Sequence, residues 1–228
     1  MWQALRAELH PRGLEIVTVA LDTNATAPIQ WIERAAPEHA SLIVQSHLVD
    51  ELFGITNVPM SVWIDEAGMI VRPAEPAHPA VRRAADRPLP DDLPPRTREM
   101  LTEARKIRTE PEKYLAALRD WVEHGAASRY ALDPDEVIAR SQPRGLDEAT
   151  AAAHFELGYY AYLHGRIGDA ARNWRLAHRL QPDNWTYRRQ AWSLADPEQG
   201  PTDLYESDWL SDVRKIGAEN YYPPLRMD

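Results

Sequence analysis

The sequence predicts an α/β domain followed by an all-α helical domain. Up to residue 73, strand-like segments alternate with helix-like segments, the pattern of a layered α/β sheet. Residues 73–96 hold seven prolines, which indicates a linker or an irregular wrap. After that, apolar residues recur three and four positions apart, as on the buried face of a helix. The predicted division is an α/β domain at 1–73, a linker at 74–96, a helical domain at 97–196 and an irregular aromatic tail at 197–228.

The α/β part opens with a short amphipathic helix over residues 2–10, which Pro11 and Gly13 end. The segment Leu14–Asp22 is rich in β-branched residues and almost continuously apolar, which is typical of a strand buried on both faces. The other elements expected here are, in order, a helix from Pro28 to Ala36, a strand at Ser41–Gln45, a helical turn or two ending at Gly54, and a β-hairpin that turns at Gly68.

The second half of the chain predicts helices only. Gly125 provides a stop signal for one of them, and Gly165 separates two others. The expected segments are 97–108, 111–125, 133–140, a pair of helices within 147–184, and one candidate in the tail at 207–217.

Composition excludes several classes of protein. The net charge of -9 over 228 residues argues against a nucleic-acid partner, because phosphate binding requires a surplus of Lys and Arg. No stretch approaches about 18 consecutive apolar residues, so no membrane span is expected. The chain has no cysteine, which removes disulfides, thiolate nucleophiles and Cys-ligated metals together.

The pair of helices around Gly165 resembles a tetratricopeptide repeat. Leu157 and Gly158 supply a large and then a small residue on the first helix, and the second carries small, large and small residues at Ala170, Trp174 and Ala177. The unit departs from the family at His154, where Trp is usual, and at Ala161, where Tyr is usual. An ordinary helical hairpin without repeat ancestry is the alternative. Because one repeat cannot bury its own face, we expect it to pack on other parts of the chain.

Three segments of the N-terminal part resemble the thioredoxin-like superfamily. They are "RGLEIVTVALD", "LFGITNVP" and "MSVWIDEAGMIV", which look like the strand after the redox helix, the approach to the cis-proline loop and the closing hairpin. They resemble in particular the redoxin branch of bacterial thiol–disulfide oxidoreductases and peroxiredoxin-like proteins. The resemblance covers about a third of the chain and implies a cis bond at Val58–Pro59, with the residue before the proline offering backbone hydrogen bonds to an extended substrate.

The family's central strand and its Cys-x-x-Cys would precede the helix that begins at Trp2. The sequence contains neither, so we expect a thioredoxin-like domain with an incomplete central sheet, from a chain missing its N-terminal portion. Thiol exchange requires a thiolate, and this chain is therefore expected to be inert as a thiol enzyme. The absent strand would lie between Leu14–Asp22 and Pro59–Asp65. Those strands would then pair differently, accept a strand from another chain, or leave edges open to homo-oligomer formation.

Two sets of residues are candidates for binding a protein or peptide partner. The first is Val58 and Pro59, for which the alternative is a proline that merely starts a strand. The second is an aromatic-lined groove formed by Trp174, Trp185 and Trp192, for which the alternative is that these indoles join the aromatic tail to the helices. The leading functional hypothesis is thus a redoxin-related protein that is inactive as a thiol enzyme, and the second is an interaction module that uses the helical repeat.

No other chemistry stands out. The eight histidines are scattered, so neither a metal site nor a cofactor is expected. Asp65 and Glu66 lie at a predicted hairpin tip and indicate a solvated turn rather than acid–base catalysis. The chain shows no secretory signal, which favours the cytoplasm, with a periplasmic or exported location as the alternative if the N-terminal portion is missing.

Overall fold

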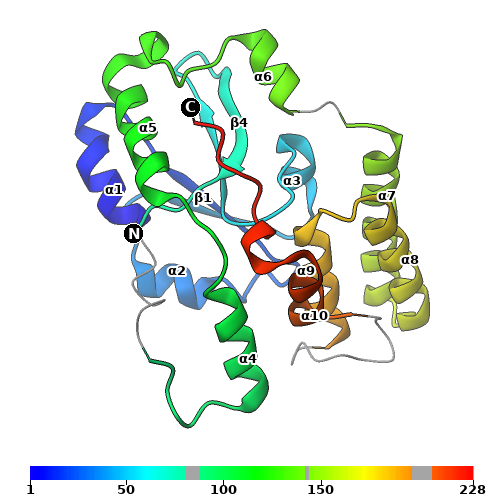
Figure 1. Cartoon of the computed structure of the whole chain (residues 1–228). Helices are drawn as coiled ribbons and strands as arrows, with labels where there is room; N and C mark the ends of the chain where they lie inside the picture. Colours follow the sequence, from blue (N-terminus) through cyan, green and yellow to red (C-terminus); the bar gives the residue numbers. More distant parts are fainter. Residues whose placement is uncertain (81–87, 142–143, 197–206, 228) are drawn as a thin grey trace.

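The computed structural model describes residues 1–80, 88–141, 144–196 and 207–227 of a mixed α/β protein with two small sheets and many helices (Figure 1). The N-terminal elements are α1 (Trp2–Leu9), η1 (His10–Arg12), β1 (Val17–Leu21), α2 (Ile29–Ala35), β2 (Ala40–Val44), α3 (Leu48–Phe53), β3 (Met60–Ile64) and β4 (Ile70–Pro76). The helical elements are α4 (Pro95–Ala104), α5 (Pro111–His124), η3 (Gly125–Ala127), α6 (Pro134–Ser141), α7 (Leu146–Leu163), α8 (Ile167–Leu180), α9 (Trp185–Ala195), α10 (Trp209–Ile216) and η4 (Ala218–Asn220). In the described part of the chain, no helix has the length and apolar character needed to cross a membrane.

The strands form two separate pairs. β1 and β2 are parallel, in a register that runs from Val17 opposite Ala40 to Leu21 opposite Val44. β3 and β4 form an antiparallel hairpin with irregular register around Trp63. Within the described residues no ladder joins the two pairs, so β1 and β3 each have one edge without a strand partner.

The prediction that the first strand is buried on both faces is wrong. β1 is shorter than the predicted Leu14–Asp22, and its side chains Val17 and Val19 are 55% and 38% exposed. On the neighbouring strand Leu42 is 51% exposed. Burial on both faces requires cover above and below the sheet, and a parallel pair without further strands offers helices little surface to cover.

The hairpin extends further than the sequence indicated. β4 continues through Pro76, and the next residue, Ala77, is fully buried, so the chain is still packed where residues 74–96 predicted a linker. Part of that predicted linker, 81–87, lies outside the described residues. At the hairpin tip the carboxylate of Asp65 accepts hydrogen bonds from the backbone N–H of Ala67 and of Met69, at 3.0 and 2.8 Å, which confirms a turn there.

One hydrophobic core joins α1, the hairpin and α5. Trp63 of β3 stacks on Trp121 of α5, with ring centroids 5.0 Å apart, and Leu5 and Leu9 of α1 pack into the same cluster. Gly125 ends α5 with a positive φ of 54°, a conformation that glycine adopts without the steric cost of a Cβ. The helix therefore stops where the sequence predicted.

The second core lies between α7, α8 and α9. Phe155 and Trp174 are fully buried in it. A Cβ on Gly158 would lie 2.5 Å from the Trp174 ring and 3.2 Å from the Ala170 carbonyl oxygen, so α7 and α8 approach as closely as the repeat-like pattern of small residues indicated. Leu157, the expected large residue of that pattern, is instead 49% exposed.

The C-terminal strap, residues 221–227, connects the two cores. Tyr221 and Tyr222 are buried in the helical core, whereas Leu225 and Met227 are buried in the core of α1, the hairpin and α5. Figure 1 shows this red segment running from the region of α9 and α10 back across the molecule toward α5 and β4. The predicted helix in the tail is present as α10, and residues 197–206 lie outside the described part of the chain.

Candidate functional site

The loop between α3 and β3 carries a cis peptide bond at Val58–Pro59, as the resemblance implied. Asn57 precedes it and is buried, with 1% of its surface exposed. Its side-chain amide donates a hydrogen bond to the Tyr221 carbonyl oxygen at 2.9 Å. The loop is therefore fastened to the C-terminal strap.

Both backbone polar groups of Val58 are engaged within the protein. Its N–H donates to the Oδ1 of Asn57 at 2.8 Å, and its carbonyl oxygen accepts from the Tyr222 hydroxyl at 2.7 Å. The resemblance implied that these groups bind an extended substrate. In this structure the protein's own side chains occupy them, so that expectation is not met.

Helix α9 approaches the same loop end-on. The backbone N–H groups of Trp185 and Thr186 donate to the Thr56 carbonyl oxygen at 2.6 and 3.3 Å. These are donors that the first turn of a helix leaves unpaired. Asn184 caps the helix by accepting a hydrogen bond from the Tyr187 N–H at 3.1 Å. The helical half is thus bonded directly to the cis-proline loop.

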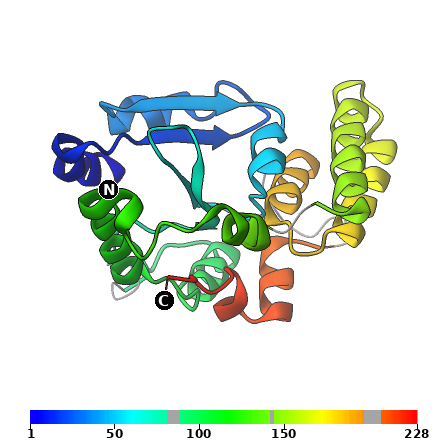
Figure 2. The same cartoon turned by 90° about the horizontal axis from the view of Figure 1, so that it is seen from above.

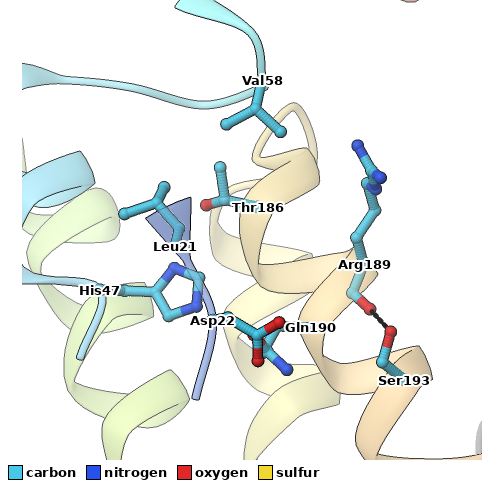
Figure 3. A pocket seen from close by; sticks show the side chains of 8 residues that line it. All are labelled: Leu21, Asp22, His47, Val58, Thr186, Arg189, Gln190 and Ser193. Carbon is cyan, nitrogen blue, oxygen red and sulfur yellow. Dashed lines mark hydrogen bonds between the residues drawn. The ribbon is translucent and has the colours of Figure 1, made fainter. Parts of the chain in front are cut away.

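A cavity of about 220 Å³ lies beside this loop, at the carboxyl ends of β1 and β2 (Figure 3). In open α/β structures, ligands bind at the carboxyl ends of parallel strands. One wall comes from the α/β half and the other from α9. The lining residues are Leu21, Asp22, His47, Val58, Thr186, Arg189, Gln190 and Ser193.

A buried histidine–aspartate pair stands in the wall of this cavity. The Nδ1 of His47 lies 2.7 Å from the Oδ2 of Asp50, and the Thr186 hydroxyl also lies 2.7 Å from Oδ2. The His47 side chain is 4% exposed and that of Asp50 is 1% exposed. Among the described residues, the Nε2 of His47 and the Oδ1 of Asp50 have no hydrogen-bond partner.

This pair fixes the imidazole but does not form a nucleophile–base arrangement. Since the carboxylate accepts from Nδ1, the neutral ring carries its lone pair on Nε2. The Thr186 hydroxyl can donate to Asp50 or to Asn184, whose Oδ1 is 2.6 Å away, and it makes no hydrogen bond to His47. The geometry therefore positions a histidine ring without activating a hydroxyl.

The surroundings of the pair are acidic. Burial raises the pKa of the Glu156 carboxyl, and the negative charge of Glu51 raises it further. Burial also raises the pKa of the Tyr187 hydroxyl, again with a contribution from Glu51. Among the described residues no group of three or more His, Cys, Asp or Glu side chains could hold a metal ion.

Asp50 itself lines a second cavity, of about 360 Å³. Its charged lining includes Glu51, Glu148 and Asp183, together with Arg144, whose guanidinium is 3.2 Å from the Glu51 carboxylate. This cavity is an acidic hollow in the surface whose charge Arg144 partly neutralises, and its lining indicates no specific chemistry.

The three tryptophans predicted to line a groove do not do so. Trp174, Trp185 and Trp192 are 0%, 6% and 3% exposed and belong to the helical core. Trp185 packs on Tyr221 of the strap, with ring centroids 4.7 Å apart. Their arrangement corresponds to the alternative, in which the indoles hold the tail to the helices.

Of the residues that line the first cavity, only Val58 was among the binding residues predicted from the sequence. The sequence has no second histidine at helical spacing from His47, yet Asp50 stands three residues later, a spacing that brings both side chains to one face of a helical turn. Arg189 and Gln190 carried no local signal, because they reach the cavity only through the packing of α9 on the α/β half.

Comparisons with protein-family models, curated proteins and solved structures give no match to this chain.

Proposed function

We propose that this chain is a thioredoxin-like protein of the redoxin branch that performs no thiol chemistry and serves as a binding scaffold. The observation that carries the proposal is the pairing of strands. A parallel pair, β1–β2, and an antiparallel hairpin, β3–β4, remain separate, as expected of a sheet that lacks the strand between them. The absence of cysteine leaves no thiolate for disulfide exchange.

An insulin-reduction assay tests the absence of thiol chemistry. With dithiothreitol as the electron source, the chain should not accelerate insulin precipitation above the rate with the reductant alone. A thioredoxin with its Cys-x-x-Cys intact serves as the positive control. Turnover by this cysteine-free chain would refute the proposed inertness.

Hydrogen–deuterium exchange tests the open strand edges. In a parallel pair, alternate residues of β1 direct their amides away from β2, and those amides should exchange rapidly if no strand covers them. Amides that bond to β2 should exchange more slowly. Protection of every β1 amide would mean that both edges are paired, and sedimentation would then show whether a second copy supplies the strand.

A second candidate function rests on the exposed face of α7. Leu157, Tyr160 and Leu163 are 49%, 53% and 62% exposed, and Leu146 at the start of the helix is 82% exposed. The sequence of α7 contains Asp and Glu but no Lys or Arg. We infer that an occupant would be an amphipathic helix from another protein, with its apolar residues packed against Leu157, Tyr160 and Leu163.

Site-specific photo-crosslinking tests this second candidate. A crosslinking residue at Leu157 should capture a protein that the same residue at Arg172, on the exposed side of α8, does not capture. When the captured protein is identified and purified, its binding to this chain should weaken in a Leu157→Ser, Tyr160→Ser variant. No crosslink at Leu157, or equal crosslinks at both positions, would reject the α7 face as a docking surface.

A further inference from the structure

The cavity beside Val58 contains two opposite charges that are not paired with each other. Asp22 follows the last residue of β1, and Arg189 projects from α9 (Figure 3). Among the described residues neither makes an ion pair. The Oδ1 of Asp22 accepts one hydrogen bond, from the Asn24 N–H at 2.9 Å. Within the described residues, each wall of the cavity therefore offers one charge without a counter-ion, half-buried at Asp22 and solvent-exposed at Arg189.

The rest of the lining consists of apolar groups, polar hydroxyl and amide groups, and the His47 imidazole. Leu21 and Val58 supply apolar contacts, while Thr186, Gln190 and Ser193 supply hydroxyl and amide groups. The volume of about 220 Å³ is below the roughly 300–1,000 Å³ typical of sites for drug-sized ligands. A ligand of this site is therefore small, with a positive end, a negative end and a short apolar part.

We propose that this cavity binds a free α-amino acid, with its ammonium group at Asp22 and its carboxylate at Arg189. A carboxylate matches the forked donors of a guanidinium, and an ammonium group matches the acceptor oxygens of Asp22. Leu21 and Val58 face the ligand's side chain and favour short apolar ones. The buried His47–Asp50 pair fixes one wall, so the site needs little rearrangement to accept the ligand. This inference does not depend on the thioredoxin-like assignment, because it uses only the lining of the cavity.

Isothermal titration calorimetry with the standard L-amino acids, one at a time, tests the proposal on the full chain. At least one with a short apolar side chain should bind with 1:1 stoichiometry. Its N-acetyl derivative and its carboxamide each lack one charge and should bind roughly tenfold to a hundredfold more weakly, since hydrogen bonds to charged groups carry that much selectivity. The proposal fails if no amino acid binds with a dissociation constant below about 10 mM.

Two variants assign the ends of the ligand. Asp22→Asn should weaken binding of the amino acid and abolish the preference over its N-acetyl derivative, while Arg189→Gln should abolish the preference over its carboxamide. Asp147→Asn on α7 and Arg179→Gln on α8 are matched controls on exposed residues that line neither cavity, and they should bind as the parent does. Thermal unfolding of each variant verifies that it is folded. Retention of both preferences in folded Asp22 and Arg189 variants would place the ligand elsewhere and overturn the proposal.

Discussion

The helical half and the parallel strand pair differ in how completely they bury their apolar side chains. In the helices, Phe155 and Trp174 are fully buried, whereas Val17 of β1 and Leu42 of β2 are 55% and 51% exposed. Figure 2 shows the strand pair, in blue, along the top edge of the molecule and α7 and α8, in yellow-green, at the right side. Two strands alone bury too little surface to be stable without help. The cavity beside Val58 thus lies at the end of a strand pair with exposed apolar side chains, against α9, whose tryptophans are buried in the helical core.

The largest expected effect follows from removing the central indole of the helical core. Trp174→Ala should lower the free energy of unfolding by about 3–5 kcal/mol, because it leaves a cavity that the surrounding helices cannot fill. The matched change in the strand pair, Val17→Ala, should cost no more than about 0.5 kcal/mol, since most of that side chain is already in water. Urea unfolding monitored by circular dichroism measures both. Equal losses would show that the strand pair is buried in solution.

A smaller effect is expected where α7 and α8 touch. Gly158→Ala places a methyl group against Trp174 and should cost about 1–3 kcal/mol, although Ala alone favours a helix over Gly. Gly168→Ala on α8 is the control, because a Cβ there meets no atom within 4 Å. It should be neutral or stabilising in the same urea titration. A stabilised Gly158→Ala protein would mean that the two helices are further apart than described.

The strap contact at the cis-proline loop is expected to contribute less. Tyr222→Phe removes the hydroxyl that donates to the Val58 carbonyl oxygen and should lower the free energy of unfolding by about 0.5–1.5 kcal/mol. Tyr160→Phe, on an exposed tyrosine of α7, should change it by much less. Thermal unfolding compares the two variants. An unaffected Tyr222→Phe protein would show that the bond contributes nothing to holding the strap in place.

His178 on α8 should make the free energy of unfolding depend on pH below neutrality, with no effect at neutral pH. Burial lowers its pKa to about 3, with a further contribution from Arg188, whereas the ordinary value is 6.5. Because the unfolded chain binds this proton more readily, the free energy of unfolding should fall as the pH drops from 6.5 toward 3. His178→Gln should flatten that part of the profile, measured by urea unfolding at several pH values. An unchanged slope in the His178 variant would contradict this account.

Local patterns predicted most of the elements correctly. Gly125 ends a helix, Asp65 forms a turn and Gly158 allows close helix packing, each for a reason contained within a few residues of sequence. Long-range contacts were not predictable in this way. The strand at Leu14–Asp22 has the composition of a buried strand, and its exposure depends on which neighbours cover it.

The candidate site was predicted even less completely. Val58 was named from a resemblance, and the structure then placed its backbone groups against Asn57 and Tyr222, the latter from the far end of the chain. Arg189 reaches the cavity only because α9 bonds to Thr56. Contacts across more than a hundred residues leave no periodic trace in a single sequence.

The strap has a consequence for how the molecule comes apart. A few residues anchor Tyr222 in one core and Leu225 in the other, while Lys113 of α5 donates a hydrogen bond to the Leu225 carbonyl oxygen at 2.9 Å. Unfolding of either core therefore removes strap contacts that stabilise the other core. Because the strap is anchored in both cores, we expect the two halves to unfold on heating in a single cooperative step.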